Sequence, residues 1–209
     1  MRNSIIRKAI LIGCPGATNY LYGVAEDLKN MKQFLFSDKG GTWFPNEIVI
    51  LSNPTFEQLS KEVHSTRTEY NFIYFSGHGF TSQNRKRMLS LNDKSIEDLF
   101  FVNKSLRQLI IIDACRTYIA PGISGVPEFV EEYDSFDGEY EARDLFDRYI
   151  VNSPHGKIIL HSTQMGHYSY ESTSGGYFTS ALLKILLMQS LTFISPFLLN
   201  GWLKFCPRN

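Results

Sequence analysis

Two short apolar runs, each ending abruptly in small and polar residues, constrain the fold of this chain most strongly. The first lies in Asn71–Phe80 (NFIYFSGHGF) and ends in Ser-Gly-His-Gly, with the histidine at His78. The second lies in Leu109–Thr117 (LIIIDACRT) and ends in Asp-Ala-Cys, with the cysteine at Cys115. Runs this short and apolar are typical of strands buried on both faces of a parallel sheet, where reactive groups gather at the carboxyl ends. We therefore expect His78 and Cys115 to lie at one edge of a sheet.

The rest of the chain alternates between strand and helix patterns. We expect further strands at Lys8–Gly13, Glu47–Leu51 and Lys157–Ser162, a small hairpin within Arg85–Leu91, and helices at Gly23–Ser37, from Thr55, from Ser95 and at Gly176–Met188. This alternation predicts an α/β fold, a three-layer sandwich with a mainly parallel central sheet and right-handed crossovers. The length of 209 residues suits a single domain.

Composition narrows the possible partners and the cellular compartment. The 21 basic and 21 acidic residues balance to a formal net charge of zero, which argues against general nucleic-acid binding. Three cysteines, Cys14, Cys115 and Cys206, form no even set for disulfides, and this favours a reducing, cytoplasmic setting. The stretch Ile185–Leu203 has no charged residue, but its polar residues favour a buried helix followed by a strand or loop over a membrane span.

A cysteine beside a histidine is the arrangement that makes a thiol nucleophile. The thiolate is the reactive form, and a nearby imidazole can take the thiol proton and later return a proton to the leaving amine. The backbone amides of Gly79 and Cys115 are placed to form an oxyanion hole. We expect Cys14 to be a small buried core residue. No Cys/His spacing indicates zinc, so we predict no bound structural metal.

Residues 118–153 lack a regular period and are rich in Asp and Glu, so we read them as a flexible acidic linker between residues 1–117 and 154–209. The linker has three interpretations. It is a solvated insert, or a segment for autoprocessing with Arg116, Arg143 or Arg148 as cleavage points, or a Ca²⁺ site, since hard oxygen ligands cluster there. No cofactor is required by the predicted chemistry, and calcium activation remains an open alternative.

The two motifs resemble those of the caspase-like cysteine peptidases, especially the metacaspase and bacterial caspase-like branch. The motif residues are Tyr74–Gly79 (YFSGHG) and Ile112–Arg116 (IDACR). Lys8–Gly13 is similar to the first strand of that family, Leu21–Leu35 to its first helix, and Lys157–Leu183 to its small-subunit half. The resemblance implies that His78 and Cys115 form the catalytic dyad, with the amides of Gly79 and Cys115 as the oxyanion hole.

Departures from the caspase pattern bear on specificity. Leu21 stands where caspases that cut after Asp carry an arginine, and Asp113 stands where they carry glutamine. By resemblance, Asp27, Ser76 and Asp113 match positions where metacaspases line a pocket for Arg or Lys. Two carboxylates in one pocket repel each other, and an entering guanidinium or ammonium relieves that repulsion. Tyr170 and Glu171 stand where caspases place an aromatic residue and an arginine, and we expect them to contact substrate as well.

The leading hypothesis is a cysteine endopeptidase that cleaves protein or peptide substrates after Arg or Lys. An Asp-specific caspase-type protease is the nearest enzymatic alternative, and the missing cation at Leu21 argues against it. A non-catalytic caspase-like regulatory or interaction module is a second class, which the presence of both His78 and Cys115 disfavours. A flavodoxin-like binding domain fits the order of strands and helices but does not explain the histidine and the cysteine at the ends of the two apolar runs. The sequence leaves the oligomeric state open.

Overall fold

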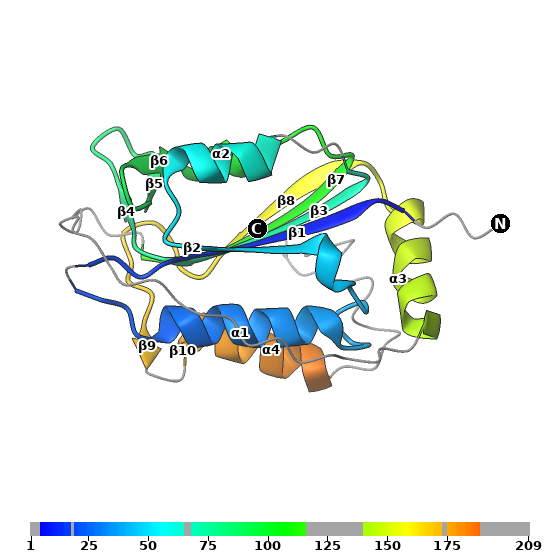
Figure 1. The fold of residues 1–209 in the computed structure, drawn as a ribbon. Helices are drawn as coiled ribbons and strands as arrows, with labels where there is room; N and C mark the ends of the chain where they lie inside the picture. Colours follow the sequence, from blue (N-terminus) through cyan, green and yellow to red (C-terminus); the bar gives the residue numbers. More distant parts are fainter. Residues whose placement is uncertain (1–4, 18, 65–67, 116–139, 173–174, 189–209) are drawn as a thin grey trace, which may run out of the picture.

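A five-stranded sheet in which every strand runs parallel to its neighbours forms the centre of the computed structural model (Figure 1). The structure describes residues 5–17, 19–64, 68–115, 140–172 and 175–188. The strand order is β2-β1-β3-β7-β8, from β1 (Arg7–Cys14), β2 (Ile48–Ser52), β3 (Tyr70–Gly77), β7 (Arg107–Ala114) and β8 (Gly156–His161). Helices flank this sheet on both faces, so the predicted α/β fold is confirmed.

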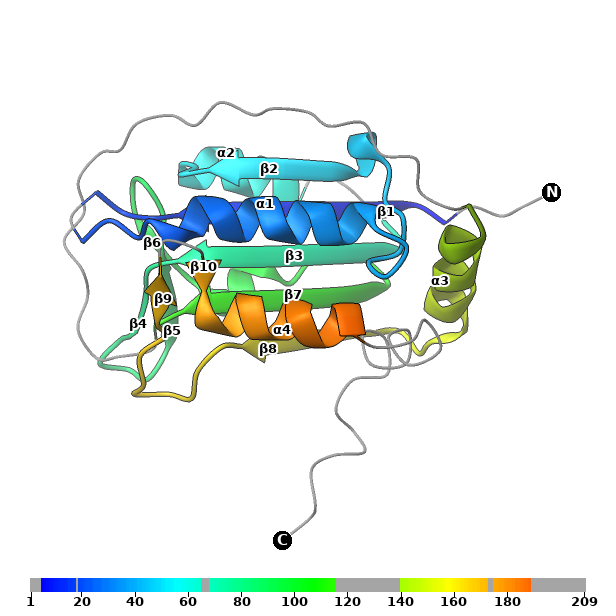
Figure 2. The same cartoon turned by 90° about the horizontal axis from the view of Figure 1, so that it is seen from below.

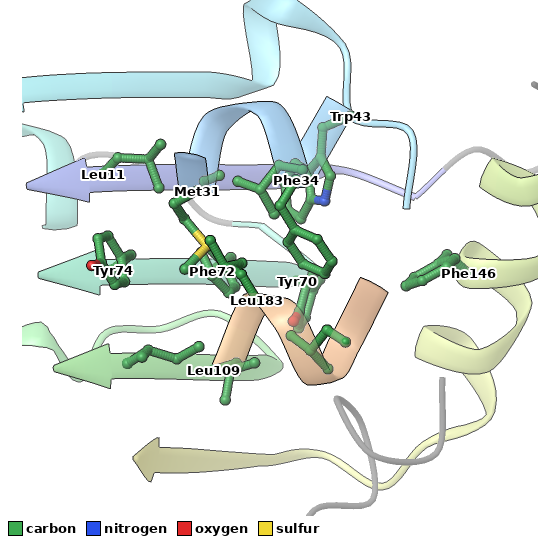
Figure 3. Close-up of a cluster of buried hydrophobic side chains, with 14 of the residues drawn as sticks. Leu11, Met31, Phe34, Trp43, Tyr70, Phe72, Tyr74, Leu109, Phe146 and Leu183 are labelled. Atoms are coloured by element: carbon green, nitrogen blue, oxygen red, sulfur yellow. The ribbon is translucent and has the colours of Figure 1, made fainter. Parts of the chain in front are cut away.

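The three central strands distribute their side chains alternately between the two faces of the sheet. Helices α1 (Gly23–Phe36) and α4 (Tyr177–Met188) cover one face (Figure 2), and α2 (Phe56–His64) covers the other. Leu11 and Phe72 belong to the cluster under α1 and α4, whereas their neighbours Ile10 and Ile73 belong to the cluster on the opposite face. Figure 3 shows the first of these clusters. Because both faces are covered, the middle of each central strand is apolar on both sides, as in buried parallel strands.

A three-stranded antiparallel ribbon lies at the carboxyl ends of the parallel strands (Figure 1). It consists of β4 (Gly79–Thr81), β5 (Arg87–Ser90) and β6 (Ser95–Glu97). Arg85–Leu91, where a small hairpin or bulge was expected, contains the single strand β5, which pairs with β4 and β6 outside that range. The helix expected from Ser95 is wrong. Ile96 pairs with Leu89 and is buried between two half-buried neighbours, an alternation that belongs to a strand. A 3₁₀ turn, Asp98–Phe101, follows.

The helix predicted from Thr55 begins with a reciprocal cap. The backbone N–H of Thr55 donates to Oε1 of Gln58 at 2.8 Å, and the N–H of Gln58 donates to Oγ1 of Thr55 at 3.3 Å. This capping box satisfies backbone donors at the start of α2 that have no partner within the helix.

Part of the predicted acidic linker is a helix, so that prediction is wrong for residues 140–152. Helix α3 (Tyr140–Asn152) lies at the end of the sheet where the strands begin (Figure 1). Its Ala142, Phe146 and Ile150 are buried at intervals of four residues, a helical stripe that the abundant charges around it conceal in the sequence. The remainder of the linker, up to residue 139, lies outside the described residues.

A buried ionic cluster fastens α3 to the start of the sheet. The Arg143 guanidinium donates to both carboxylate oxygens of Glu47, at 2.9 and 2.6 Å, and to the carbonyl of Thr42 at 3.0 Å. Arg7 of β1 lies 3.4 Å from a carboxylate oxygen of Asp147 and 3.6 Å from one of Glu47. Burial acts to raise the pKa of Glu47, but the hydrogen bonds from Arg143 and Phe44 outweigh it, and this pKa is lowered. Because Arg143 is buried within a folded helix, it is a poor cleavage point for autoprocessing.

Helix α4 ends at Met188, so most of the apolar stretch Ile185–Leu203 lies outside the described residues. Among the described helices, none combines the length and the apolar character needed to cross a membrane.

Replacing Arg143 with alanine is expected to lower the free energy of unfolding by about 3 kcal/mol, because the buried carboxylates of Glu47 and Asp147 would lose a partner. Arg148→Ala is the matched control. Arg148 lies on the same helix, is exposed, and donates to the carbonyl of Asp144. Urea unfolding of both variants measures the difference. Equal stability of the two variants would contradict the anchoring role of Arg143.

Candidate active site

His78 and Cys115 directly follow two neighbouring strands at the same edge of the sheet. Strands β3 and β7 pair in parallel as far as Gly77 and Ala114, and the next residue on each is His78 or Cys115. We call this end of β1, β3 and β7 the carboxyl edge. This register confirms the prediction that His78 and Cys115 lie at the same edge of the sheet.

Backbone groups hold His78 from three sides. Its Nε2 lies 3.0 Å from the carbonyl oxygen of Asn19, its N–H donates to the carbonyl of Cys14 at 3.2 Å, and its own carbonyl accepts from Ser90 at 3.0 Å. Since a carbonyl oxygen only accepts, Nε2 carries the hydrogen in the Asn19 contact. Burial lowers the pKa of His78, and the carbonyls of Asn19 and Pro15 oppose that shift. The imidazole is therefore neutral at pH 7, the form that can accept a proton.

The loop that presents the Asn19 carbonyl has an unusual backbone conformation. Asn19 has a φ of 56°, in the left-handed region that asparagine adopts more readily than most residues. The loop is closed by a hydrogen bond of 3.0 Å from the N–H of Leu21 to the carbonyl of Pro15. Asn19 was not among the predicted site residues, because its contribution is a main-chain oxygen that no side-chain pattern reveals.

The thiol of Cys115 contacts the loop between β8 and β9 (Glu171–Ser172). Its Sγ donates to the carbonyl of Ser169 at 3.3 Å, and the N–H of Ser169 lies 3.4 Å from the same sulfur. The preceding residue is fixed as well, because the N–H of Ala114 donates to Oγ of Ser162 at 3.2 Å. Cys115 is half-buried, whereas Cys14 is buried at the end of β1, as expected of a small core residue.

Gly79 brings the chain after His78 close to Cys115. A Cβ on Gly79 would lie 2.7 Å from the carbonyl oxygen of Cys115 and 3.0 Å from Cβ of Ala114, so only glycine allows this approach. The two residues predicted to form the oxyanion hole are thus neighbours. Their role in holding an oxyanion stays a prediction.

Asp27, Ser76 and Asp113, predicted to line one pocket, come together from three elements. Asp27 lies on α1, Ser76 on β3 and Asp113 on β7, and both carboxylates are buried. The Ser76 hydroxyl donates to Oδ2 of Asp27 at 2.8 Å. Burial and then the negative charges of Asp27 and Asp113 raise the pKa of Tyr74 well above its ordinary value. Both acidic side chains thus lie close enough to Tyr74 to act on its hydroxyl.

The backbone of β10 (Gly175–Gly176) reaches both carboxylates. The N–H of Gly176 donates to Oδ1 of Asp27 at 2.8 Å. A Cβ on Gly176 would lie 3.1 Å from Oδ2 of Asp27 and well inside van der Waals distance of Oδ2 of Asp113. Gly175 has a φ of 115°, and a Cβ there would lie 2.6 Å from Asp27. These glycines let main chain pass where any side chain would collide with the two aspartates.

Asp113 accepts hydrogen bonds from two further hydroxyl groups, those of Thr179 and Ser169, which were not among the predicted site residues. Oγ1 of Thr179 on α4 donates to Oδ2 at 2.8 Å, and the hydroxyl of Ser169 donates to Oδ1 at 2.6 Å. Thr179 also lies 2.6 Å from the Tyr74 hydroxyl, within the buried layer under α4. Both residues are more than fifty positions from Asp113 in sequence, so only the folded chain reveals the contacts.

The other predicted substrate contacts lie at the margin of this cluster. Tyr170 is 65% exposed, and its carbonyl accepts from the N–H of Tyr177 at 2.9 Å. Glu171 begins β9 opposite Gly176, but its side chain lies outside the described part of the chain. Contact of either residue with substrate stays a prediction.

The described residues contain no group of three or more His, Cys, Asp or Glu side chains that could hold a metal ion. The acidic residues of the linker between positions 118 and 139 fall outside the described part of the chain, so calcium binding by the linker stays a prediction. A small cavity of about 20 Å³ lies away from the carboxyl edge, between α1, α3 and the start of the sheet, and includes Arg7, Trp43, Tyr70 and Phe146 in its lining. Its space suffices for about one water molecule and not for a substrate.

The parallel sheet with a histidine and a cysteine on adjacent strand ends defines a fold and site of the caspase-like class of cysteine peptidases. The profile of the caspase domain, peptidase group C14, matches residues 6–195. The chain therefore belongs to the caspase-domain family of cysteine-type peptidases. The comparison with curated proteins gives no match.

Gly176→Ala is expected to lower the free energy of unfolding by about 1–3 kcal/mol, because the added methyl group collides with Asp113 and Asp27. Gly156→Ala is the matched control. A Cβ there meets nothing within 4 Å, and we expect a change within about 0.5 kcal/mol. Urea unfolding compares the two variants, and an unaffected Gly176→Ala protein would disprove the close approach of β10 to the carboxylates.

Proposed function

We propose that this chain is a cysteine endopeptidase that uses His78 and Cys115 as its catalytic dyad and cleaves after Arg or Lys. In this mechanism His78 takes the thiol proton, and Sγ of Cys115 attacks the carbonyl carbon of the scissile bond. The resulting oxyanion is stabilised by the amides of Gly79 and Cys115. The imidazolium then protonates the leaving amine, and water hydrolyses the acyl-enzyme with His78 as the base.

The preference for a basic residue rests on one observation, the burial of two carboxylates around Gly176 beside the nucleophile. Asp27 is 2% exposed and Asp113 is 5% exposed. Burying negative charge is costly unless the charge is compensated, and a guanidinium or ammonium that reaches an outer oxygen of these aspartates would supply that compensation along with charge-assisted hydrogen bonds. A substrate carboxylate would instead add a third negative charge. Asp-specific cleavage is disfavoured for this reason, and Leu21 offers no cation to offset it.

We also propose that the protein belongs to the metacaspase-like branch and works in the reducing cytoplasm. Asp27, Ser76 and Asp113 support the first part through their match to the basic-specific pattern. Cys14 and Cys115, neither of which forms a disulfide within the described part of the chain, support the second.

Asp113→Asn is expected to reduce kcat/KM for an Arg-ending fluorogenic peptide about 10- to 100-fold, because a charge-assisted bond to the substrate cation is replaced by a neutral one. Asp27→Asn is expected to act in the same direction. Glu26→Gln, next to Asp27 on α1 but pointing to Lys29 at the surface, is the matched control and is expected to retain activity.

The same assay includes an Asp-ending peptide and Cys115→Ala. We expect wild-type protein to cleave only the Arg-ending peptide and Cys115→Ala to cleave neither. Equal turnover of both peptides would contradict the proposed specificity, and unchanged turnover by Cys115→Ala would contradict the proposed nucleophile.

The acid limb of the pH profile of kcat/KM is expected to lie below pH 6.5, the ordinary pKa of histidine, because burial lowers the pKa of His78. The neutral, proton-accepting imidazole then persists to lower pH, and activity falls only as the pH drops through the lowered value. His155→Gln, at an exposed position before β8, is expected to leave the profile unchanged. A limb above pH 6.5 would contradict the neutral resting state of His78.

A further inference from the structure

Ser169 is in direct contact with both the thiol and one of the predicted specificity carboxylates. Its hydroxyl donates to Oδ1 of Asp113 at 2.6 Å. Its carbonyl accepts from Sγ of Cys115 at 3.3 Å, and its N–H lies 3.4 Å from that sulfur. One loop residue thus joins two groups that the proposed reaction uses for different purposes, one for recognition and one for attack.

The hydrogen bond from Sγ of Cys115 to the Ser169 carbonyl uses the thiol proton. A thiol donates its proton to a carbonyl oxygen, whereas a thiolate has no proton to donate and is repelled by the partial negative charge of that oxygen. Transfer of the proton to His78 therefore requires the Sγ–H···O bond to break. Loss of the carbonyl contact favours the nucleophilic form, whereas the N–H of Ser169 can donate to a thiolate as well as to a thiol.

The two oxygens of Asp113 are held in different ways. Oδ2 accepts from the hydroxyl of Thr179 at 2.8 Å and from its N–H at 3.3 Å, both on helix α4. Oδ1 accepts from Ser169, on a loop where Gly166 has a φ of 86°. The helix is anchored in the core through Leu182, Leu183 and Leu186, whereas residues 164–168 of the loop are exposed. A group that competes for Asp113 displaces the loop contact more readily than the helix contacts.

We propose that Ser169 is a positioning residue that couples recognition of a basic side chain to release of the Cys115 thiol. A guanidinium or ammonium group that donates to Oδ1 of Asp113 replaces the Ser169 hydroxyl there. The Ser169 carbonyl then moves away from Sγ, and the thiol proton passes to the His78 imidazole, leaving a thiolate and an imidazolium. Only hydrogen bonds and one proton are exchanged. This inference rests on the proposed preference for Arg or Lys.

The test measures how fast iodoacetamide alkylates Cys115, with ethylguanidine as a small probe for the basic side chain. For wild-type protein we expect ethylguanidine to accelerate alkylation about fivefold, the effect of losing about one hydrogen bond from the resting arrangement. Tetramethylammonium at equal concentration has no N–H to donate to Asp113, and we expect it to have no effect.

Three variants give the coupling its specific signature. Ser169→Ala is expected to be alkylated about fivefold faster than wild type without ethylguanidine, and to respond no further when it is added. Ser169→Thr keeps a hydroxyl and is expected to restore the low basal rate and the response. Ser82→Ala removes a serine hydroxyl from the β4–β5 turn, where it accepts from Lys86, and is expected to behave as wild type.

The outcomes separate this inference from the proposed function when Arg-peptide hydrolysis is measured in parallel. The coupling is overturned, and the peptidase proposal stays intact, if the protein hydrolyses the Arg-peptide but ethylguanidine does not change the alkylation rate. The same conclusion follows if the protein hydrolyses the peptide and Ser169→Ala is alkylated at the wild-type rate. Acceleration that depends on Ser169 without any hydrolysis supports the coupling and overturns the peptidase proposal. Neither hydrolysis nor acceleration overturns both.

Discussion

The parallel register between β3 and β7 is the constraint on which the whole candidate site depends. It pairs Gly77 with Ala114, so that His78 and Cys115 come next on adjacent strands, and it pairs Ser76 with Asp113 one step earlier. Successive residues of a strand face opposite sides of the sheet, so a slip of one residue would turn Asp113 away from α1 and α4. The same register thus sets both the proposed nucleophile–base pair and the negative cluster beside it.

The parts of this arrangement that could be predicted from sequence are those encoded by local pattern. The apolar run of β7 ends abruptly at Asp113, and Thr55 and Gln58 form the expected capping box at the start of α2. The grouping of Asp27, Ser76 and Asp113 was expected from motif resemblance, and the fold brings the three together because α1 packs against β1 and β3. Local pattern, together with one family resemblance, therefore located the edge and its main side chains.

The parts that could not be predicted depend on contacts between distant residues or on main-chain atoms. Asn19 reaches His78 across 59 positions through a carbonyl, and Ser169 reaches Cys115 across 54 positions through its backbone. Helix α3 was missed for another reason. Its charged residues resemble a solvated linker, yet Arg143 and Asp147 are buried in the ionic cluster with Glu47 and Arg7. Sequence charge alone does not distinguish a solvated face from an internally compensated one.

The two ends of the sheet handle buried charge in opposite ways, and this difference bears on function. At the amino end, Arg7 and Arg143 compensate Glu47 and Asp147 within the protein, which fixes α3 and creates a structural junction. At the carboxyl edge, neutral hydroxyls and amides from Ser76, Gly176 and Thr179 stabilise the carboxylates. We expect a cluster of two buried carboxylates bound by neutral donors to favour a cationic group on the substrate, which is the physical basis for expecting recognition, and not merely stability, from Asp27 and Asp113.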